Sequence, residues 1–478
     1  MVRSAMLAAA ALLALGPSAF AQSTEPAEKG TRQDQVAPKS VPRAAAPAEA
    51  TPPASEAKPA PSDAKAGDAE RTRIAQSKLA YSLIERLDKE KKPGDNVVVS
   101  PASLALVLAL VDLGADEKLR VAIHRTLGFD PAGAPTPPPA AAAKAPKGKA
   151  KAPAKAAEPV PEVNKDAALE LRRLRDTIVE LRGDKALADV FAIANMFVFD
   201  PSSPPLESAE IALKAKGAEV RLETLSEAAT IKRINEWVAE QTKGLIPAIL
   251  ERPLTNAGLV GLNALYFKDS WQTPFEASAT KPAPFQTAGG GTIEVPMMAL
   301  RAGPRAYRAE DNFIALDLPY AHDRFSMTII TTKDKSARAA EFAKVASWLG
   351  GEGFGEKLVE LSFPRFSLTA HEELLPPLDA MGLKEARTAR GSLKNFSSAQ
   401  QGISQITQKT FLKVDEAGTE ASAVTAVVTA RSAGGPRPEK IVFDKPFMFA
   451  LRDNTTGLML MAGYVGTPSA GPVAELKQ

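Results

Sequence analysis

The segment that most constrains the fold is residues 418–435, a long connection between two strand-like runs. It consists almost wholly of Ala, Ser, Thr, Val and Gly, with one acid, Glu420, and one base, Arg431. A connection of this length without an Asn-Gly or Pro-Gly turn is unusual. Alternate positions from Thr419 onwards form two faces of small side chains, as in a strand. Because a strand inside a sheet must bury its inward face, the segment is suited to become an additional central strand.

On composition alone, a solvated Ala-rich linker is the favoured explanation of the same residues. The rest of the chain has to decide between the two interpretations.

The first residues of the chain have the pattern of an export signal. Residues 1–21 combine the basic Arg3, a short apolar run and the small-x-small ending Ala19-Phe20-Ala21, which predicts a secretory signal peptide. Residues 22–66 are rich in Ala, Pro, Glu and Lys with few large apolar side chains, which predicts a disordered tether. We therefore expect a secreted protein, either periplasmic or extracellular.

One folded domain is expected over residues 67–468, followed by a flexible tail at residues 469–478. Residues 131–161 interrupt the domain with a low-complexity insertion of Pro, Ala and Lys, which a surface loop tolerates well. A solvated loop is the favoured interpretation of this insertion. The alternative is a cationic patch that contacts a polyanion. Its lysines are Lys144, Lys147, Lys149, Lys151 and Lys155.

Composition excludes several classes of protein. The chain has no cysteine, so disulfides and thiol catalysis are excluded. The formal net charge of +3 is too small to indicate nucleic acid as a partner. The apolar run near the N-terminus is too short to cross a bilayer and no later run is long enough, so we expect no membrane span. We expect a monomer.

The sequence offers little that could support catalysis. Its three histidines, His124, His322 and His371, are not accompanied by a G-x-S-x-G motif, by metal-ligand spacing or by HExxH. We interpret all three as structural or solvated, with His371 at a helix start. The glycines at 289–291 lack the lysine and hydroxyl of a nucleotide-binding loop. We therefore expect no catalytic residue, no metal and no cofactor, and the chain is not predicted to be an enzyme.

Several short sequence motifs, called phrases below, lie at the ends of helix-like and strand-like runs. A β-branched run leads into Ser100-Pro101-Ala102-Ser103-Leu104, where serine before proline is typical of a helix start. Before the small residues stands Asp415-Glu416-Ala417-Gly418-Thr419-Glu420-Ala421-Ser422-Ala423. The other phrases are Ile234-Asn235-Glu236-Trp237-Val238, Asn263-Ala264-Leu265-Tyr266-Phe267-Lys268-Asp269-Ser270-Trp271, Leu316-Asp317-Leu318-Pro319-Tyr320 and Asp444-Lys445-Pro446-Phe447-Met448-Phe449.

Taken in order, these phrases resemble the serpin family of protease inhibitors over about residues 70–467, apart from the insertion. The acidic pair followed by Gly-Thr-Glu and small residues resembles the hinge of that family. The resemblance implies an α+β fold with a large, mainly antiparallel sheet and two smaller sheets. It also implies about eight or nine helices around the sheets and an exposed reactive loop near the C-terminus. The low-complexity N-terminal extension indicates a bacterial-type member.

The resemblance also implies roles for single residues. Gln408 departs from the histidine that is common at this position in animal serpins, although an amide can bridge the same neighbours. Ordinary helix capping and core packing are the alternative roles for Ser100, Asn263 and Trp271. The residues expected to form the hinge are Glu416, Gly418, Thr419, Glu420, Ala421, Ser422 and Ala423. The residues expected to control opening of the large sheet are Ser100, Ser103, Asn263, Trp271 and Gln408.

The function implied by the resemblance is suicide-substrate inhibition of serine or cysteine proteases. The target cleaves the reactive loop, forms an acyl-enzyme and is trapped while the loop inserts as a strand. Counting from Gly418 places the cleaved bond at Ser432-Ala433 or, with a count shorter by one, at Arg431-Ser432. We favour Arg431, the only large side chain there, which indicates a trypsin-like protease. Ser432 or Ala433 would suit an elastase-like or subtilisin-like protease.

Two other functions are alternatives. The first is a non-inhibitory protein of serpin fold that binds or stores a molecule. Such proteins usually carry proline or bulky charged residues in the hinge, and residues 418–429 contain no proline. The second is a secreted hydrolase, which would depend on one of the three histidines.

Overall fold

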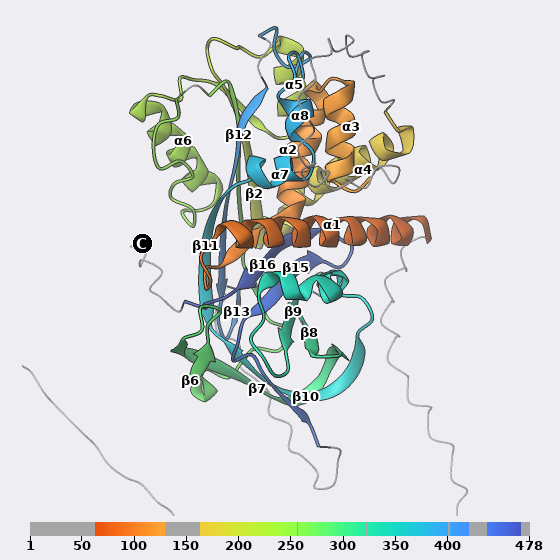
Figure 1. The fold of residues 1–478 in the computed structure, drawn as a ribbon, viewed down its shortest axis with the longest axis vertical. Helices are drawn as coiled ribbons and strands as arrows, with labels where there is room; N and C mark the ends of the chain where they lie inside the picture. Colours follow the sequence, from red (N-terminus) through yellow and green to blue (C-terminus); the bar gives the residue numbers. More distant parts are fainter. Residues whose placement is uncertain are drawn as a thin grey trace, which may run out of the picture. The chain divides into compact units, whose positions relative to one another are not determined.

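The computed structural model describes residues 63–129, 163–255, 257–321, 323–399, 402–419 and 437–469. These residues belong to one compact unit (Figure 1). The expected signal peptide, the insertion with its five lysines and nearly all of the tether lie outside the described residues. Residues 420–436, which contain most of the small-residue segment, and residues 470–478 also lie outside them.

A five-stranded sheet carries the strand that leads into the small-residue segment. From one edge to the other, its strands are β11 (Phe366–Glu373), β12 (Ile403–Val414), β4 (Leu259–Phe267), β2 (Phe191–Phe199) and β3 (Glu219–Leu222). The central neighbours β12 and β4 are parallel and pair directly with each other. Strands β11 and β2 flank this pair and are antiparallel to it. The sheet therefore has a parallel ladder at its centre.

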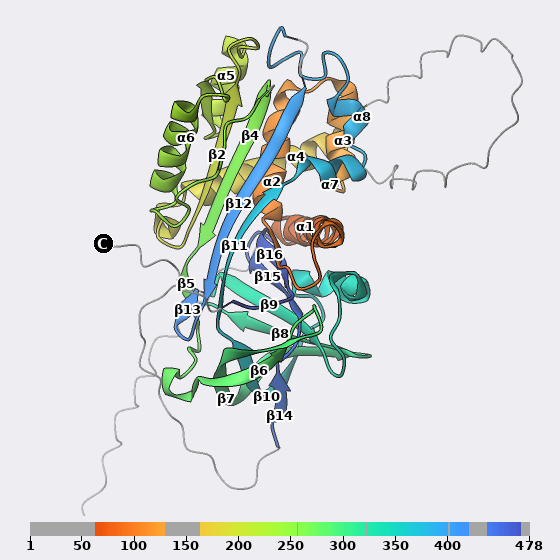
Figure 2. The same cartoon turned by 60° about the vertical axis from the view of Figure 1, so that its left-hand side comes forward.

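Both faces of this sheet are covered by helices, which explains why its central strands read as continuous apolar runs. On one face, Leu262 of β4 packs in a cluster with Ile234 of helix α6 (Ala228–Gln241). On the other face, Leu265 of β4 joins the main core, which includes helix α2 (Pro101–Gly114). Figure 2 shows α6 and α2 on opposite sides of the sheet. Even-numbered and odd-numbered residues of β4 thus face different helices.

A nine-stranded sheet and a two-stranded sheet complete the β-structure. In spatial order, the strands of the large sheet are β1 (Val97–Val99), β16 (Met459–Val465), β15 (Phe447–Asp453), β9 (Phe325–Thr332), β8 (Phe313–Pro319), β7 (Thr292–Glu310), β10 (Gly355–Pro364) and β14 (Glu439–Val442), with β6 (Lys281–Gln286) paired to β7. The small sheet pairs β13 (Gly418–Thr419) with β5 (Asp269–Ser270). Strand β1 pairs with β16, so Val97 lies opposite Tyr464.

Helices lie around these sheets. The other α-helices among the described residues are α1 (Asp63–Glu90), α3 (Glu117–Thr126), α4 (Lys165–Gly183), α5 (Glu207–Ala215), α7 (Leu375–Ala380) and α8 (Lys384–Arg387). Three 3₁₀ segments are η1 (Lys185–Leu187), η2 (Ala277–Ala279) and η3 (Ala339–Gly350). The expected α+β architecture, with one large, mainly antiparallel sheet and two smaller sheets, is confirmed.

Helix α2 follows directly from its sequence. Ser100 is its N-cap, and the Ser100 hydroxyl accepts a hydrogen bond from the backbone N–H of Ser103 at 3.3 Å. Pro101 occupies the first helical position. A backbone N–H there would have no partner within the helix, so proline costs no hydrogen bond. The whole helix except Asp112 and Leu113 is buried, as its all-round apolar character predicts. The start of α2 is thereby fixed against the five-stranded sheet.

Two element boundaries differ from the sequence-based expectation. Helix α1 begins at Asp63, before the boundary expected at residue 66, and before the first apolar residue of its pattern, Ile74. The apolar run of the sequence from Leu187 to Phe199 favours a strand over its whole length, but β2 begins only at Phe191, because residues 185–187 form η1 after an Asp184 cap. Both differences lie at element ends, where polar caps and not apolar periodicity decide the boundary.

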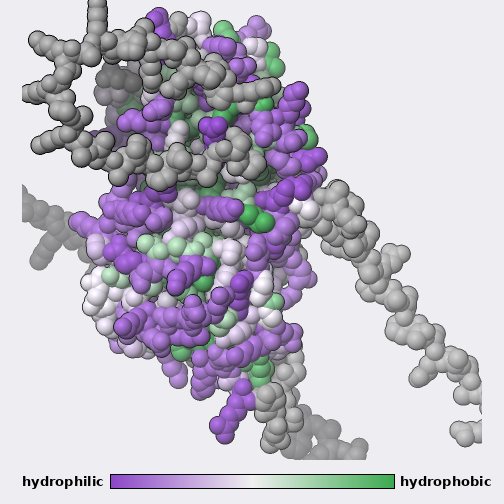
Figure 3. Space-filling model, turned by 45° about the vertical axis from the view of Figure 1, so that its right-hand side comes forward, coloured by the Kyte–Doolittle hydropathy of each residue, from purple (hydrophilic) through white to green (hydrophobic). Residues whose placement is uncertain are grey.

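One face of the molecule is mostly polar. Figure 3 shows a face on which hydrophilic residues predominate and hydrophobic ones are scattered or in small groups. No helix among the described residues has the length and apolarity needed to cross a bilayer. The exposed large apolar side chains of the described residues are Ile74, Leu169, Leu206, Ile211, Leu222 and Val442.

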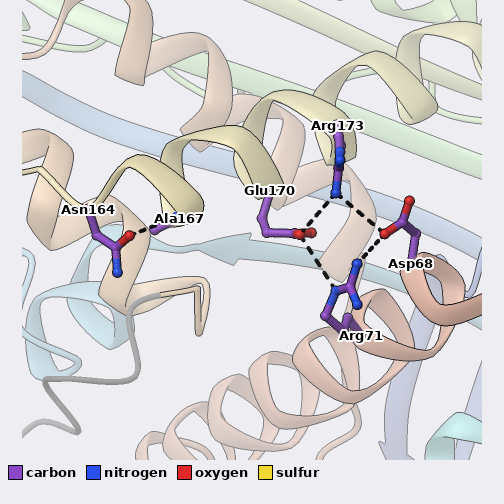
Figure 4. A network of polar contacts seen from close by, with 6 residues as sticks. All are labelled: Asp68, Arg71, Asn164, Ala167, Glu170 and Arg173. Atoms are coloured by element: carbon purple, nitrogen blue, oxygen red, sulfur yellow. Dashed lines mark hydrogen bonds and ion pairs between the residues drawn. The ribbon is translucent and has the colours of Figure 1, made fainter. Parts of the chain in front are cut away.

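The early start of α1 brings its first turns against α4 (Figure 4). The Glu170 carboxylate lies 3.5 Å from Arg71 and 3.3 Å from Arg173, and Asp68 also pairs with both arginines. All four side chains are at least one-quarter exposed to solvent. Solvent screening and side-chain entropy make such pairs weak.

We expect Glu170→Gln to lower the free energy of unfolding by less than about 1 kcal/mol, because exposed ion pairs contribute little. Urea unfolding at low and high salt measures the effect, which should shrink as salt screens the charges. Glu180→Gln, at an exposed position of the same helix, is the matched control. A loss several times larger than in this control would show that the cluster is a structural clamp.

Candidate functional site

The chain leaves β12 through a tight turn that begins at Asp415. The Asp415 backbone N–H donates to the carbonyl oxygen of Gly418 at 2.9 Å. The Asp415 carboxylate accepts hydrogen bonds from the backbone N–H groups of Ala417 at 3.1 Å and Gly418 at 3.2 Å. Strand β13 then pairs antiparallel with β5, with Thr419 opposite Asp269. The chain is therefore held as β-structure immediately before residue 420.

Glu416, the second acid of the pair, holds the turn from the other side. Its carboxylate accepts a hydrogen bond from the Thr280 hydroxyl at 2.7 Å and lies 3.4 Å from the Arg365 guanidinium. Its backbone oxygen accepts from the N–H of Phe275 at 2.8 Å. The two acids thus stabilise one turn through different neighbours.

Gly418 is required by a close approach of two backbones. A Cβ atom at this position would lie 2.2 Å from the carbonyl oxygen of Asp269 and 2.6 Å from the Cα of Ser270. Any other residue would have to separate β13 from β5. The glycine of the hinge sequence therefore permits the small two-stranded sheet.

Trp271 joins the turn to the core. Its backbone N–H donates to the oxygen of Ala417 at 2.9 Å, and its indole Nε1–H donates to the oxygen of Asp415 at 3.0 Å. The indole stacks on the ring of Tyr320, with centroids 4.4 Å apart and an interplanar angle of 19°. Among the sheet-opening residues expected from the sequence, Trp271 is the one that contacts the hinge.

Thr419 is buried at the end of this chain of contacts. Its Oγ1 lies 2.7 Å from the hydroxyl of Tyr320, and both residues are 0% exposed. Burial raises the pKa of Tyr320 well above its ordinary value, so the phenol stays protonated and keeps its hydrogen-bonding proton. The last described residue of the hinge is therefore bound to the core by a buried hydrogen bond.

The other residues expected to control opening of the large sheet lie instead in the smaller, five-stranded sheet and at the start of α2, where they form a buried network. Gln408, Asn263 and Asn195 lie side by side on β12, β4 and β2, and each is 1% exposed. The Gln408 amide nitrogen donates to Asn263 Oδ1 at 3.0 Å. Asn263 Nδ2 donates in turn to Asn195 Oδ1 at 2.6 Å. One row of side-chain amides thus crosses the parallel ladder.

The start of α2 covers this row. The backbone N–H of Ser100 donates to Gln408 Oε1 at 2.6 Å, and Gln408 Nε2 donates to the Ser100 oxygen at 3.1 Å. Asn263 Nδ2 also donates to the Ser103 hydroxyl at 2.6 Å. Gln408 therefore bridges the helix and the neighbouring strand, and both polar atoms of its amide have partners. At the other end of the row, Asn195 Nδ2 is buried and has no hydrogen-bond partner among the described residues.

Sequence reasoning missed two members of these contacts. Asn195 is the one polar residue in the otherwise apolar sequence of β2, and this was the signal that could have identified it. Tyr320 was within one of the phrases, but nothing in the sequence pairs it with Thr419. The expected residues divide into two groups: Trp271 lies with the hinge, whereas Ser100, Ser103, Asn263 and Gln408 form the amide network.

Part of the expected site lies outside the described residues. This part comprises the hinge residues Glu420, Ala421, Ser422 and Ala423 and the reactive-bond residues Arg431, Ser432 and Ala433.

The two histidines that the structure describes lie in different elements. His124 lies in α3, where it is buried and its Nε2 is 3.2 Å from Asp112 Oδ1. The expectation that His371 starts a helix is wrong: it lies in β11, with Nδ1 3.4 Å from Glu251. β11 is an edge strand in which exposure alternates from residue to residue. This alternation accounts for the positions of Glu372 and Glu373 better than a helix start does. His322 lies outside the described residues.

Comparison with known proteins identifies what the chain is similar to. The family described as Serpin (serine protease inhibitor) matches residues 74–468. The leukocyte elastase inhibitor of Sus scrofa is 29% identical over 412 residues, which is 84% of this chain and 100% of that protein. Iripin-8 of Ixodes ricinus is 33% identical over 245 residues, which is 49% of this chain and 61% of Iripin-8.

A solved structure with a similar fold is that of human thyroxine-binding globulin complexed with its ligand. The two chains superpose with a TM-score of 0.68 at 22% sequence identity, covering 84% of this chain and 100% of the other. At this identity the likeness concerns the fold alone.

Proposed function

The chain belongs to the serpin family, and from this we propose that it is an exported suicide-substrate inhibitor of serine proteases. Cysteine proteases are a second class of target. In this proposal the chain acts as a monomer, residues 1–21 direct export, and the protein works in the periplasm or outside the cell. It contributes no catalytic residue of its own, since the chemistry is that of the target protease.

The observation that carries the proposal is the direct parallel pairing of β12 with β4. Strand β12 runs towards the hinge, so a segment that turns back after Thr419 runs antiparallel to both strands. Insertion between them replaces one parallel ladder with two antiparallel ladders, and parallel pairing is the less stable of the two kinds. The small side chains of residues 420–429 suit a strand that is covered on both faces.

The chemical step in this proposal is ordinary peptide cleavage that stops halfway. The serine hydroxyl of the protease attacks the carbonyl carbon of Arg431, and the bond to Ser432 breaks. The proton passes to the departing amine, so Ser432 becomes a new N-terminus. The protease remains esterified to Arg431 while residues 420 onwards enter the sheet. Displacement of the protease then prevents water from completing the hydrolysis.

The hinge contacts and the amide network are the features that insertion has to break. The Thr419 hydroxyl must leave Tyr320, and the bond between Gln408 and Asn263 must open. Both are buried hydrogen bonds, so their loss has a barrier in the absence of protease. This supports a sheet that stays closed until the loop is cut.

We expect the protein to form a complex with trypsin that survives denaturing electrophoresis, with the released C-terminal fragment beginning at Ser432. The arginine in the cleaved position would pair with a buried carboxylate in the specificity pocket. Mass spectrometry of the fragment identifies the bond. Arg431→Ala should abolish the trypsin complex, whereas Arg437→Ala, at an exposed arginine just before β14, should not.

A fragment that begins at Ala433 would instead assign the bond to Ser432-Ala433 and favour elastase-like or subtilisin-like targets. No stable complex with any serine or cysteine protease would reject the inhibitor proposal in favour of a non-inhibitory binding protein. Hydrolytic turnover that is lost on changing His124, His322 or His371 would favour the hydrolase.

A further inference from the structure

A cavity of about 200 Å³ lies beside Trp271, at the point where the hinge meets the core. Its apolar wall includes Trp271, Phe275, Leu300 and Leu318. These residues come from the segment after β5, from β7 and from β8, which are parts of the structure that insertion of a strand does not need to cross. The cavity is thus a separate feature next to the hinge.

Arg305 of β7 lines the same cavity and lacks a charged partner. One guanidinium nitrogen donates to the backbone oxygen of Arg301 at 3.0 Å. Its Nε is buried and has no hydrogen-bond partner within the described part of the chain. No carboxylate of the described residues lies within ion-pair distance of it. Burial lowers the pKa of Arg305, yet a guanidinium remains charged at neutral pH. The side chain as a whole is only partly buried, but its Nε–H is shielded from solvent and unpaired, and an anion in the cavity would give it a partner.

Two other polar side chains of the wall, Asp317 and Ser326, already have partners. Asp317 forms a bidentate pair with Arg452, with both distances 2.8 Å. The Ser326 hydroxyl donates to Asn454 Oδ1 at 2.9 Å. The cavity therefore presents one unmatched positive group and an aromatic wall. It matches a ligand with one negative charge and a flat apolar body.

We infer that this cavity binds a small aromatic carboxylate, with the carboxylate on the Arg305 guanidinium and the ring against Trp271 and Phe275. A carboxylate accepts the N–H groups of an arginine in a strong, charge-assisted contact. An aromatic ring packs well against the edge or face of the two aromatic side chains. A cavity of about 150 Å³ is enough for benzene, so the present volume holds one ring and a short acidic arm.

A ligand in this cavity would act on the hinge, a consequence that rests on the proposed inhibitory function. The backbone N–H groups of Trp271 and Phe275 hold the oxygens of Ala417 and Glu416. A ligand that packs on these two side chains stabilises the arrangement in which the hinge is bound. It should therefore slow insertion. Binding itself is measured without any protease, so its failure is distinct from failure of the inhibitor proposal.

The test is titration calorimetry of the full chain with 3-phenylpropionate and, separately, with its uncharged amide. The acid should bind at least about tenfold more tightly than the amide, the effect of one charge-assisted contact. Arg305→Gln should weaken binding of the acid by a similar factor and leave binding of the amide unchanged. Arg301→Gln is the matched control, because Arg301 lies on the same strand but is exposed and paired with Glu276 at 2.8 Å.

Equal affinity for acid and amide, or no binding of the acid at millimolar concentration, would overturn the inference. Loss of acid binding in Arg301→Gln to the same extent as in Arg305→Gln would also overturn it, since binding would then reflect general surface charge. Thermal unfolding verifies that each variant is folded. Should Arg305→Gln not fold, the comparison of acid with amide in the unaltered protein decides alone.

Discussion

Replacing Thr419 with arginine is expected to convert the protein from an inhibitor of its target protease into a substrate. Thr419 is fully buried against Tyr320 and belongs to the expected hinge, which would have to move with the inserting segment. An arginine there would place an unpaired charge between β4 and β12, at a penalty of several kcal/mol. Cleavage at Arg431 would proceed, because the protease binds the loop elsewhere. The trapped fraction should fall at least about tenfold, since about 1.4 kcal/mol already corresponds to that factor.

Denaturing electrophoresis after incubation with trypsin measures this partition as complex against cleaved inhibitor. Thr419→Ser is the matched control, because it keeps the hydroxyl that meets Tyr320 and adds no charge. It should still form the complex. Since arginine at this buried position also strains the uncut state, circular dichroism must verify the fold of each variant. Unchanged complex formation by a folded Thr419→Arg variant would contradict insertion of the hinge.

Replacing Gln408 with leucine is expected to give the largest loss of stability. The amide of Gln408 bonds to the N–H and the oxygen of Ser100 and to Asn263 Oδ1. Leucine leaves the Ser100 N–H and Asn263 Oδ1 without a partner, whereas the Ser100 oxygen keeps its hydrogen bond from the N–H of Leu104 at 3.0 Å. Each unpaired buried group costs about 1–3 kcal/mol, so, allowing for the apolar contacts that leucine regains, we expect a loss of about 2 kcal/mol or more in the free energy of unfolding.

Urea unfolding followed by circular dichroism measures this loss. Lys409→Leu is the control on the same strand, since the Lys409 side chain has no hydrogen bond to another described residue and faces the opposite side of the sheet. It should change stability by less than about 0.5 kcal/mol. If the two leucine variants were equally stable, the amide row would not be what holds the sheet closed. A second readout is the rate at which each variant loses inhibitory activity on standing, which should rise only in Gln408→Leu.

The parts of the fold that follow from local patterns could be predicted from the sequence. Helix α2 is apolar all round and has Ser100 and Pro101 at its start, so its burial and its cap were both readable. The unbroken apolar run of β4 is explained by helices on both faces of the sheet. Trp271, Asn263 and Gln408 were expected from family-like phrases, and the structure places them in two contact groups.

The parts that were missed depend on partners distant in the sequence. The contact of Tyr320 with Thr419 joins residues 99 positions apart, and no periodic pattern encodes such a pairing. In the sequence, Asn195 is an isolated polar residue in an apolar run. Its role is visible only when β2 pairs with β4, because its partner is Asn263. The exposed position of His371 in β11 was mistaken for a helix start, because the two acids that follow it resemble a first helical turn. Nothing in the sequence singles out Arg305. Its lack of a charged partner and its place in a cavity become visible only in the folded structure.

The pairing of β1 with β16 has a consequence for the order in which the chain can fold during its synthesis. Strand β1 ends at Val99, directly before Ser100, and its antiparallel neighbour is the last strand of the described chain. The ribosome makes β16 after β4, β12 and the small-residue segment are complete. The N-terminal side of the amide row is thus anchored only after all strands of the five-stranded sheet have been made. Until then, β4 and β12 lack the support of Ser100.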